Sequence, residues 1–232
     1  MYKTVVLKLS GEAIRDNTGP FNLDFLDYLA KQVKALVKKG VHVGIVVGGG
    51  NICRGRTYSK FGVDRQKADY IGMLATVMNA QILGEALKKN KVKNIVLTTY
   101  PCKNVKDYTA KSAYNYIKKG YVCVFGGGTG KPFYSTDTAC ALRAKDIKAD
   151  AILFAKNGTN GVYNKDPQKY KDAKRFESLK FDDIIKNKLE VIDLAAAIIC
   201  KKNHIQGFVF DIAEKNSIKN SADLKVTGTI IK

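Results

Sequence analysis

Long apolar runs are missing from this sequence, and with them the usual signals for a membrane or for export. The longest apolar stretches, such as 44–47 and 194–200, are far shorter than the ~20 residues of a membrane-spanning helix. Lys8 closes the first apolar stretch early, so no signal peptide is predicted. We therefore expect a cytoplasmic protein with no membrane partner.

Cysteine and histidine are also few, and their pattern does not fit the common zinc sites. The chain has five cysteines and two histidines, with no CxxC pair and an odd number of cysteines. Without an export signal this pattern predicts reduced thiols. We expect no metal site built from protein side chains, and we interpret His42 and His204 as structural residues.

The standard nucleotide-binding and hydrolase motifs are absent as well. The sequence contains neither GxxxxGK[ST] nor GxGxxG, which argues against a Walker-type ATPase and an ordinary Rossmann dehydrogenase. The GxSxG, HExxH, HRD and DFG motifs are also missing. Any phosphate chemistry must therefore come from other residues.

Acidic residues are scarce relative to basic ones. The chain carries 40 Lys and Arg against 21 Asp and Glu, a formal net charge of +19 at pH 7. Such a surface attracts phosphorylated small molecules, nucleic acid or anionic lipid. The lysines form separate doublets at expected helix ends, at 38–39, 88–89, 118–119 and 201–202. Because no block of five basic residues occurs, we favour a solvated lysine-rich surface, and a nucleic-acid partner is not predicted.

Strand and helix patterns alternate along the 232 residues, and hydrophobic residues make up 45% of them. This predicts one α/β domain over 1–232, a three-layer sandwich with a mostly parallel central sheet. The long helical pattern at 64–89 could be interrupted near Gly72 or Gly84. Strands are predicted at 2–9, 41–47, 94–99, 121–125, 151–155, 207–211 and 229–231, and helices at 24–39, 64–89, 111–118, 135–145, 181–187 and 194–203.

Two glycine clusters, 48–50 and 126–130, directly follow predicted strands. Glycine lets the backbone approach a ligand closely and turn its N–H groups toward an anion. Arg54 and Lys131 follow the clusters, and Lys8 lies at the end of the first strand. These cations indicate phosphate binding, although tight turns and an ordinary strand-end lysine would give the same pattern.

Six segments in order resemble the motifs of the amino-acid kinase superfamily, and within it the bacterial uridylate (UMP) kinase branch. The resemblance extends from residue 3 to about residue 231, nearly the whole chain. One such motif would be weak evidence, whereas six in order are specific. The segments are 8–12, 48–55, 65–79, 129–137 and 161–167, followed by the closing pair 193–196 and 228–229.

The resemblance implies a role for each matching residue. Lys8 and Arg54 would stabilise the transferring phosphoryl group, and Asp137 would order the catalytic centre. ATP would contact Lys8, Leu9, Ser10, Gly11, Gly50 and Arg54 through its phosphates, and Asn157, Tyr163 and Asp166 through its nucleoside. UMP would contact Gly49, Asp69, Thr129, Gly130, Lys131, Pro132, Phe133, Tyr134, Ser135 and Thr136. The N-terminal half would thus mainly bind UMP, and the C-terminal half ATP.

The same resemblance implies the reaction, its cofactor and its partners. It implies transfer of the ATP γ-phosphate to UMP, with Mg²⁺ on the ATP phosphates, in pyrimidine nucleotide synthesis. A homo-oligomer, most simply a homohexamer, inhibited by UTP and activated by GTP, is also implied. Two alternatives stay open: a superfamily member with a carboxylate or another phosphate as acceptor, and a basic nucleic-acid-binding regulator on the same fold.

Three positions depart from the usual family pattern. Lys131 stands where asparagine is common, Cys53 where an aromatic residue is common, and Asn160 where aspartate is common. None of the three changes removes a group needed for phosphoryl transfer. The side chain of Lys131 would either point to solvent or add positive charge near the phosphates.

Overall fold

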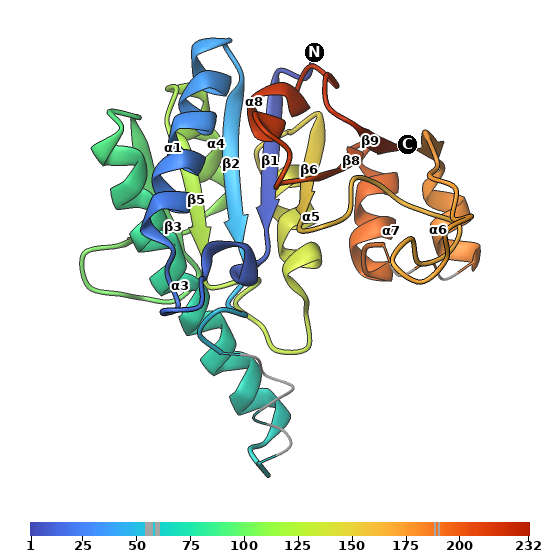
Figure 1. Cartoon of the computed structure of the whole chain (residues 1–232). Coiled ribbons are helices and arrows are strands. Elements are labelled where there is room, and N and C mark those ends of the chain that lie inside the picture. The colour runs from blue at the N-terminus through green and yellow to red at the C-terminus, as the bar shows by residue number, and fades with distance from the viewer. Residues whose placement is uncertain (54–57, 59–60, 188, 190) are drawn as a thin grey trace.

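The centre of the molecule is a sheet of parallel strands flanked by helices, as the alternating pattern predicts (Figure 1). The computed structural model describes residues 1–53, 58, 61–187, 189 and 191–232, and these form nine strands. In sheet order the strands are β4 (Lys106–Asp107), β3 (Asn94–Thr98), β5 (Val122–Gly126), β2 (His42–Val47), β1 (Thr4–Leu9), β6 (Ala151–Lys156), β8 (Gln206–Asp211), β9 (Gly228–Ile231) and β7 (Ser178–Leu179). Neighbouring strands are parallel except for the β8–β9 pair, which is antiparallel.

Helices cover both faces of this sheet and complete the three layers. One layer contains α1 (Leu23–Lys38), α3 (Arg65–Lys89) and α8 (Ser217–Ser221). The other contains α4 (Ala110–Lys118), α5 (Thr136–Asp146), α6 (Phe181–Asn187) and α7 (Leu194–Lys202). A short 3₁₀ helix, η1 (Gly11–Ile14), follows β1 directly.

The central strand β1 shows why the sequence forms a buried parallel sheet. Val5, Leu7 and Leu9 point into the core beneath α1 and α3, whereas Val6 points into the core on the α5 side. All four side chains are fully buried. A strand covered on both faces needs a nearly continuous run of β-branched and aliphatic residues, and β1 has one.

The predicted elements are confirmed to within a residue or two at their ends. Helix α3 runs unbroken through Gly72 and Gly84, and Gly84 lies so close to β3 that a Cβ atom there would be 2.7 Å from Val96 Cγ2. The sequence did not indicate β4, β7, η1 or α8. Elements of two to five residues are too short to show a hydrophobic period.

The lysine doublets and the cysteines lie in the kinds of place that the sequence predicts. Each of the four lysine doublets does lie at the C-terminal end of a helix, in α1, α3, α4 and α7. All five cysteines are free thiols, with Cys102 exposed and the other four buried. None of the described helices has both the length and the apolar character that crossing a membrane requires.

Candidate active site

The candidate site lies where the strand order of the sheet reverses. The chain passes from β1 to β2 on one side and later places β6 on the other side of β1. Loops that leave neighbouring strands in opposite directions open a crevice at the carboxyl ends of the strands, where ligands bind in such sheets. Lys8 near the end of β1 and Lys156 at the end of β6 lie at this edge of the sheet.

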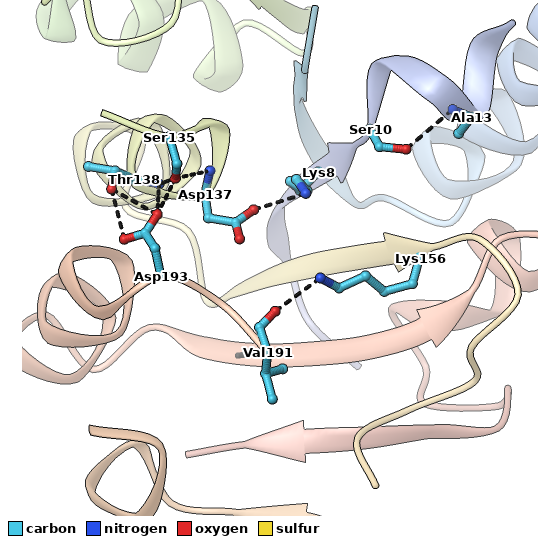
Figure 2. Close-up of polar contacts among 9 residues, drawn as sticks. All are labelled: Lys8, Ser10, Ala13, Ser135, Asp137, Thr138, Lys156, Val191 and Asp193. Carbon is cyan, nitrogen blue, oxygen red and sulfur yellow. Dashed lines mark hydrogen bonds and ion pairs between the residues drawn. The ribbon is translucent and has the colours of Figure 1, made fainter. Parts of the chain in front are cut away.

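Lys8 and Asp137 form an ion pair at this place (Figure 2). Lys8 Nζ lies 2.9 Å from Asp137 Oδ1, and the two side chains are only 12% and 16% exposed. Asp137 stands in the first turn of α5, which packs against β1. Lys8 is therefore not an ordinary solvated lysine at a strand end, because α5 packs against β1 and brings a carboxylate onto the ammonium group.

Lys156 is a third charged group of this cluster, and the sequence did not single it out. Its Nζ donates a hydrogen bond to the carbonyl oxygen of Val191, 3.0 Å away, and Figure 2 shows its side chain pointing there. Burial lowers the pKa of Lys156, the positive charge of Lys8 lowers it further, and Asp137 partly opposes both. Two cations thus share one nearby carboxylate, an arrangement that favours the approach of an anion.

Gly11, just after β1, lies directly against the glycine cluster 48–50, just after β2. A Cβ atom on Gly11 would be 2.5 Å from Gly50 N and 2.6 Å from Gly48 O, so only glycine fits there. Ser10 caps η1, since its Oγ accepts a hydrogen bond of 3.2 Å from the Ala13 N–H. The structure therefore brings Leu9, Ser10, Gly11 and Gly50, four of the residues predicted to contact ATP, close to one another, whereas Arg54 lies outside the described residues.

A cleft of about 570 Å³ opens between α3, the glycine cluster 126–130 and the start of α5. Seven of the residues predicted to bind UMP line this cleft: Gly49, Asp69, Thr129, Lys131, Tyr134, Ser135 and Thr136. Gly50 and Cys53 also contribute to its lining. Asp69 Oδ1 accepts a hydrogen bond from Arg65 Nε at 2.9 Å, and its Oδ2 accepts one from the Phe133 N–H at 2.8 Å. Asp69 therefore ties α3 to the loop before α5.

That loop, residues 127–135, has an unusual backbone. Gly127, Gly128 and Gly130 have φ values of 82°, 58° and 80°, and Phe133 has a φ of 68°. A Cβ atom on Gly127 would lie 2.2 Å from Thr99 Oγ1, which explains a glycine there. Phe133 is 65% exposed, and a non-glycine residue in this conformation on an exposed loop is common at ligand-binding sites.

Lys131 contributes to this loop through its backbone. Its N–H donates to Thr129 Oγ1 at 3.1 Å, and its carbonyl accepts from the same hydroxyl at 2.9 Å. Its side chain is exposed at the mouth of the cleft. Gly130 and Pro132 flank it in the same loop.

Asp193 holds the start of α5 in place, a role that its position in the closing motif 193–196 does not indicate. Its carboxylate accepts hydrogen bonds from the Ser135 hydroxyl and from Thr138, whose N–H lies 3.1 Å from Oδ2 (Figure 2). It also caps α7 by accepting from the Ala196 N–H at 2.8 Å. This one residue therefore fixes the start of α5, which carries Asp137, and the start of α7.

A second cleft of about 550 Å³ lies on the other side of Asp137. Apolar side chains from α6, α7 and the segment between them line it, together with Asp137 and Lys156. The residues predicted to hold the ATP nucleoside are not part of its described lining. Asn157 is exposed, Tyr163 donates its hydroxyl proton to Asn160 Oδ1 at 2.6 Å, and Asp166 accepts from the Gln168 N–H at 2.9 Å.

Carboxylates do not gather into a cation site within the described part of the chain. No group of three or more His, Cys, Asp or Glu residues there could hold a metal ion. Asp137 is the carboxylate that borders both the Lys8 ammonium and the second cleft. A divalent cation at this place would therefore take most of its ligands from a bound phosphate.

The sheet order, the paired glycine segments and the lysine–aspartate pair define the class of this protein. The chain belongs to the amino acid kinase family, whose model matches residues 3–211. It is 44% identical to a uridylate kinase of Mycoplasmopsis pulmonis (strain UAB CTIP) over 236 residues, which cover 99% of this chain and 96% of that protein. Its structure is similar to those of UMP kinases from Bacillus anthracis and Ureaplasma parvum, each with a TM-score of 0.95. The identities are 35% and 34%, and the matches cover 100% of this chain and 96% and 99% of those chains.

Proposed function

We propose that this protein transfers the γ-phosphoryl group of ATP to UMP, giving UDP and ADP. The observation that carries the proposal is the full-length similarity to relatives named uridylate kinase, combined with a cleft lined by the start of α5, the helix whose first turn carries the ion-paired Asp137. Lys8, Arg54 and Asp137 are the proposed catalytic residues.

The acceptor's own chemistry removes the need for a catalytic base. The second pKa of a phosphate monoester is about 6, so the attacking oxygen of UMP is largely ionised at neutral pH. The remaining difficulty is to bring two anions together in line. In the proposed mechanism Lys8 offsets the charge of the transferring group, Asp137 holds the Lys8 ammonium in place, and Lys156 adds a second cation.

UMP is proposed to occupy the 570 Å³ cleft. The N–H groups at the start of α5 and in the 127–135 loop would bind its phosphate, since a helix start carries partial positive charge. Asp69 would accept hydrogen bonds from the ribose hydroxyl groups. In this proposal the remaining loop residues, Thr129 to Thr136, enclose the phosphate and the uracil ring.

ATP is proposed to bind across the end of β1 and toward the C-terminal half of the chain. The N–H groups of Ser10, Gly11 and Gly50 would contact its phosphates, and Arg54 would join them. The apolar second cleft offers space for the adenine ring. Contacts of the nucleoside with Asn157, Tyr163 and Asp166 remain part of the proposal.

Mg²⁺ is the proposed cofactor, bound mainly by the ATP phosphates. Asp137 is the residue that fits a direct or water-mediated contact, because its carboxylate borders the proposed phosphate site. When bound, Mg²⁺ would neutralise part of the phosphate charge. The chain's own task is then to align the two nucleotides and exclude water between them.

We also propose that the protein is a homo-oligomer, most simply a hexamer. An exposed apolar stripe on α3 supports self-association, because Ile71, Leu74 and Met78 follow one another at helical spacing and are 42%, 52% and 52% exposed. Inhibition by UTP, activation by GTP and a cytoplasmic location complete the proposal. The five free cysteines are compatible with a reducing compartment.

The test is a coupled assay of ADP release with ATP, Mg²⁺ and a panel of nucleoside monophosphates. We expect UMP to give the highest kcat/KM, well above CMP, dUMP, AMP and GMP. Faster turnover of CMP or AMP would contradict the proposed acceptor. No turnover with any nucleoside monophosphate would contradict the proposed reaction.

A further inference from the structure

The lysine doublets that are scattered along the sequence come together in space. In a parallel α/β sandwich every helix that precedes a strand ends at the same edge of the sheet, where the next strand begins. Five such connections occur here, at 38–41, 88–93, 118–121, 145–150 and 201–205. They lead into β2, β3, β5, β6 and β8, which are all parallel to β1, so the five connections lie at the edge of the twisted sheet where these strands begin (Figure 1). We call the lysines of these five connections the basic edge.

The basic edge is strongly charged and open to solvent. The five connections contain twelve lysines and two aspartates, and no arginine. Eleven of the lysines are exposed, and Lys39 is half-buried. Four of them form ion pairs, with Asp223, Glu85, Asp27 and Asp182. The other eight have no carboxylate partner among the described residues.

Helix stability does not explain this number of lysines. One cation in the last turn already complements the helix dipole. Lys91 and Lys148 lie beyond the ends of α3 and α5 and have φ values of 57° and 54°, where Gly40 and Gly120 serve the equivalent turns after α1 and α4. A left-handed backbone conformation is less favourable for lysine than for glycine, because the Cβ atom of lysine lies close to the following carbonyl oxygen. The sequence therefore keeps a charge at two places where the backbone favours glycine.

Tyrosine rings lie among the lysines at one corner of the basic edge. Lys93 Nζ lies 4.2 Å from the centre of the Tyr121 ring. Lys118 and Lys148 both lie over the Tyr114 ring, at 5.6 and 5.1 Å. Lysines held over aromatic rings are partly ordered before any ligand arrives, which lowers the entropy lost on binding.

We propose that the basic edge binds the phosphodiester backbone of nucleic acid without regard to sequence. Lysine is a point charge suited to phosphate, and the absence of arginine argues against recognition of bases. From β3 to β8 the edge spans five strand spacings of ~4.8 Å, about 24 Å. That length matches about seven phosphates of one strand at 3.4 Å each.

The other ligands and partners of a basic surface fit this edge less well. A membrane surface would favour apolar anchors beside the lysines. Only two exposed large apolar side chains, Met1 and Leu224, lie near this edge among the described residues, whereas the apolar stripe of α3, at Ile71, Leu74 and Met78, lies toward the start of that helix, away from the edge. A second copy of the chain is also disfavoured, because two such edges would repel each other. The proposed active site lies at the opposite edge, so this binding would leave it open.

The proposal is tested by fluorescence anisotropy with a labelled 20-nucleotide single-stranded RNA and a DNA duplex of the same length. The test variant carries Lys→Gln changes at Lys91, Lys93, Lys118 and Lys148. The control variant removes the same charge elsewhere, at Lys111, Lys171, Lys174 and Lys186, which are exposed and lie outside the basic edge. A third variant places arginine at the four test positions.

We expect a Kd of about 10⁻⁶–10⁻⁴ M for the wild type, steeply dependent on salt, as for other non-specific complexes. The test variant should bind at least ten times more weakly and should show a shallower slope of log K against log salt. The control variant should change less than threefold, the arginine variant should bind like the wild type, and the kinase activity of the test variant should be unchanged.

Three results would overturn the proposal. The first is no binding to either nucleic acid at 50 mM salt. The second is equal weakening in the test and control variants, which would mean that net charge alone is responsible. The third is binding to vesicles with 30% phosphatidylserine but not to RNA or DNA. All three are binding measurements, so they are independent of whether UMP is the substrate.

Discussion

Replacing Lys8 by methionine should damage both the stability and the activity of this protein. The Lys8 ammonium lies 2.9 Å from Asp137 Oδ1, and both side chains are more than four-fifths buried. Methionine keeps the length of the side chain and removes its charge. The carboxylate of Asp137 then stays in a covered position without its partner, a situation that costs much more than the loss of an exposed ion pair.

The size of the effect follows from this burial. Breaking a buried pair by removing one partner typically costs about 3–5 kcal/mol. We expect the lower end, about 3 kcal/mol, because Lys156 is close enough for Asp137 to affect its pKa and can compensate in part. For a domain of this size that corresponds to a fall in Tm of about 6–12 °C. Turnover should fall on the order of 10²-fold or more, as expected for lost transition-state electrostatics.

A double-mutant cycle by thermal denaturation and steady-state kinetics separates the two effects. The Lys8→Met/Asp137→Asn variant should recover at least 1 kcal/mol of the stability lost by Lys8→Met, because the unpaired charge is gone, but it should recover no activity. Lys156→Met is the matched control and should cost less stability, since burial already disfavours that charge. A Lys8→Met protein as stable as the wild type, or one with near-normal turnover, would refute this reasoning.

Three further predictions follow from the site and the thiols. Asp69→Asn should raise the KM for UMP at least tenfold, with a smaller change in the KM for ATP. Equal changes in both KM values would mean that Asp69 acts only by holding the loop through Phe133. If the Lys131 ammonium group acts on phosphate, Lys131→Asn should raise the KM for UMP or lower kcat several-fold at low salt, and less at high salt. Unchanged kinetics at low ionic strength would mean that the Lys131 side chain is only solvated. Titration with a thiol reagent at pH 8 should modify Cys102 rapidly and the buried thiols only on unfolding, because burial raises the pKa of Cys123 to about 12; fast reaction of two or more thiols in the native state would contradict the burial described here.

Most of the fold could be predicted because its signals are local. Strands such as β1 and β2 are continuous aliphatic runs, and α1 and α4 end at glycines with lysines in the last turn. The glycine segments could be placed at the site for the same reason, since each directly follows a strand. The short elements β4 and β7 depend on pairing with a distant partner, which two residues cannot encode.

The parts that the sequence did not reveal depend on contacts between distant segments. Lys156 looks like an ordinary residue at the end of a strand until β6 is paired beside β1, which brings it near Lys8 and Asp137. The burial of Lys8 depends on α5, more than 120 residues away along the chain. The lysine doublets appeared scattered for a similar reason, because only the topology of the sheet brings them to one edge.

The most direct test of the proposed function follows the transferred phosphoryl group itself. Wild-type protein incubated with [γ-³²P]ATP, Mg²⁺ and UMP should give UDP that carries the label on its β-phosphate, separated by thin-layer chromatography. Lys8→Met protein that is still folded at the assay temperature should give on the order of 10²-fold less labelled UDP in the same time. Release of labelled inorganic phosphate without labelled UDP would contradict the assignment of this chain as an ATP-dependent UMP phosphotransferase.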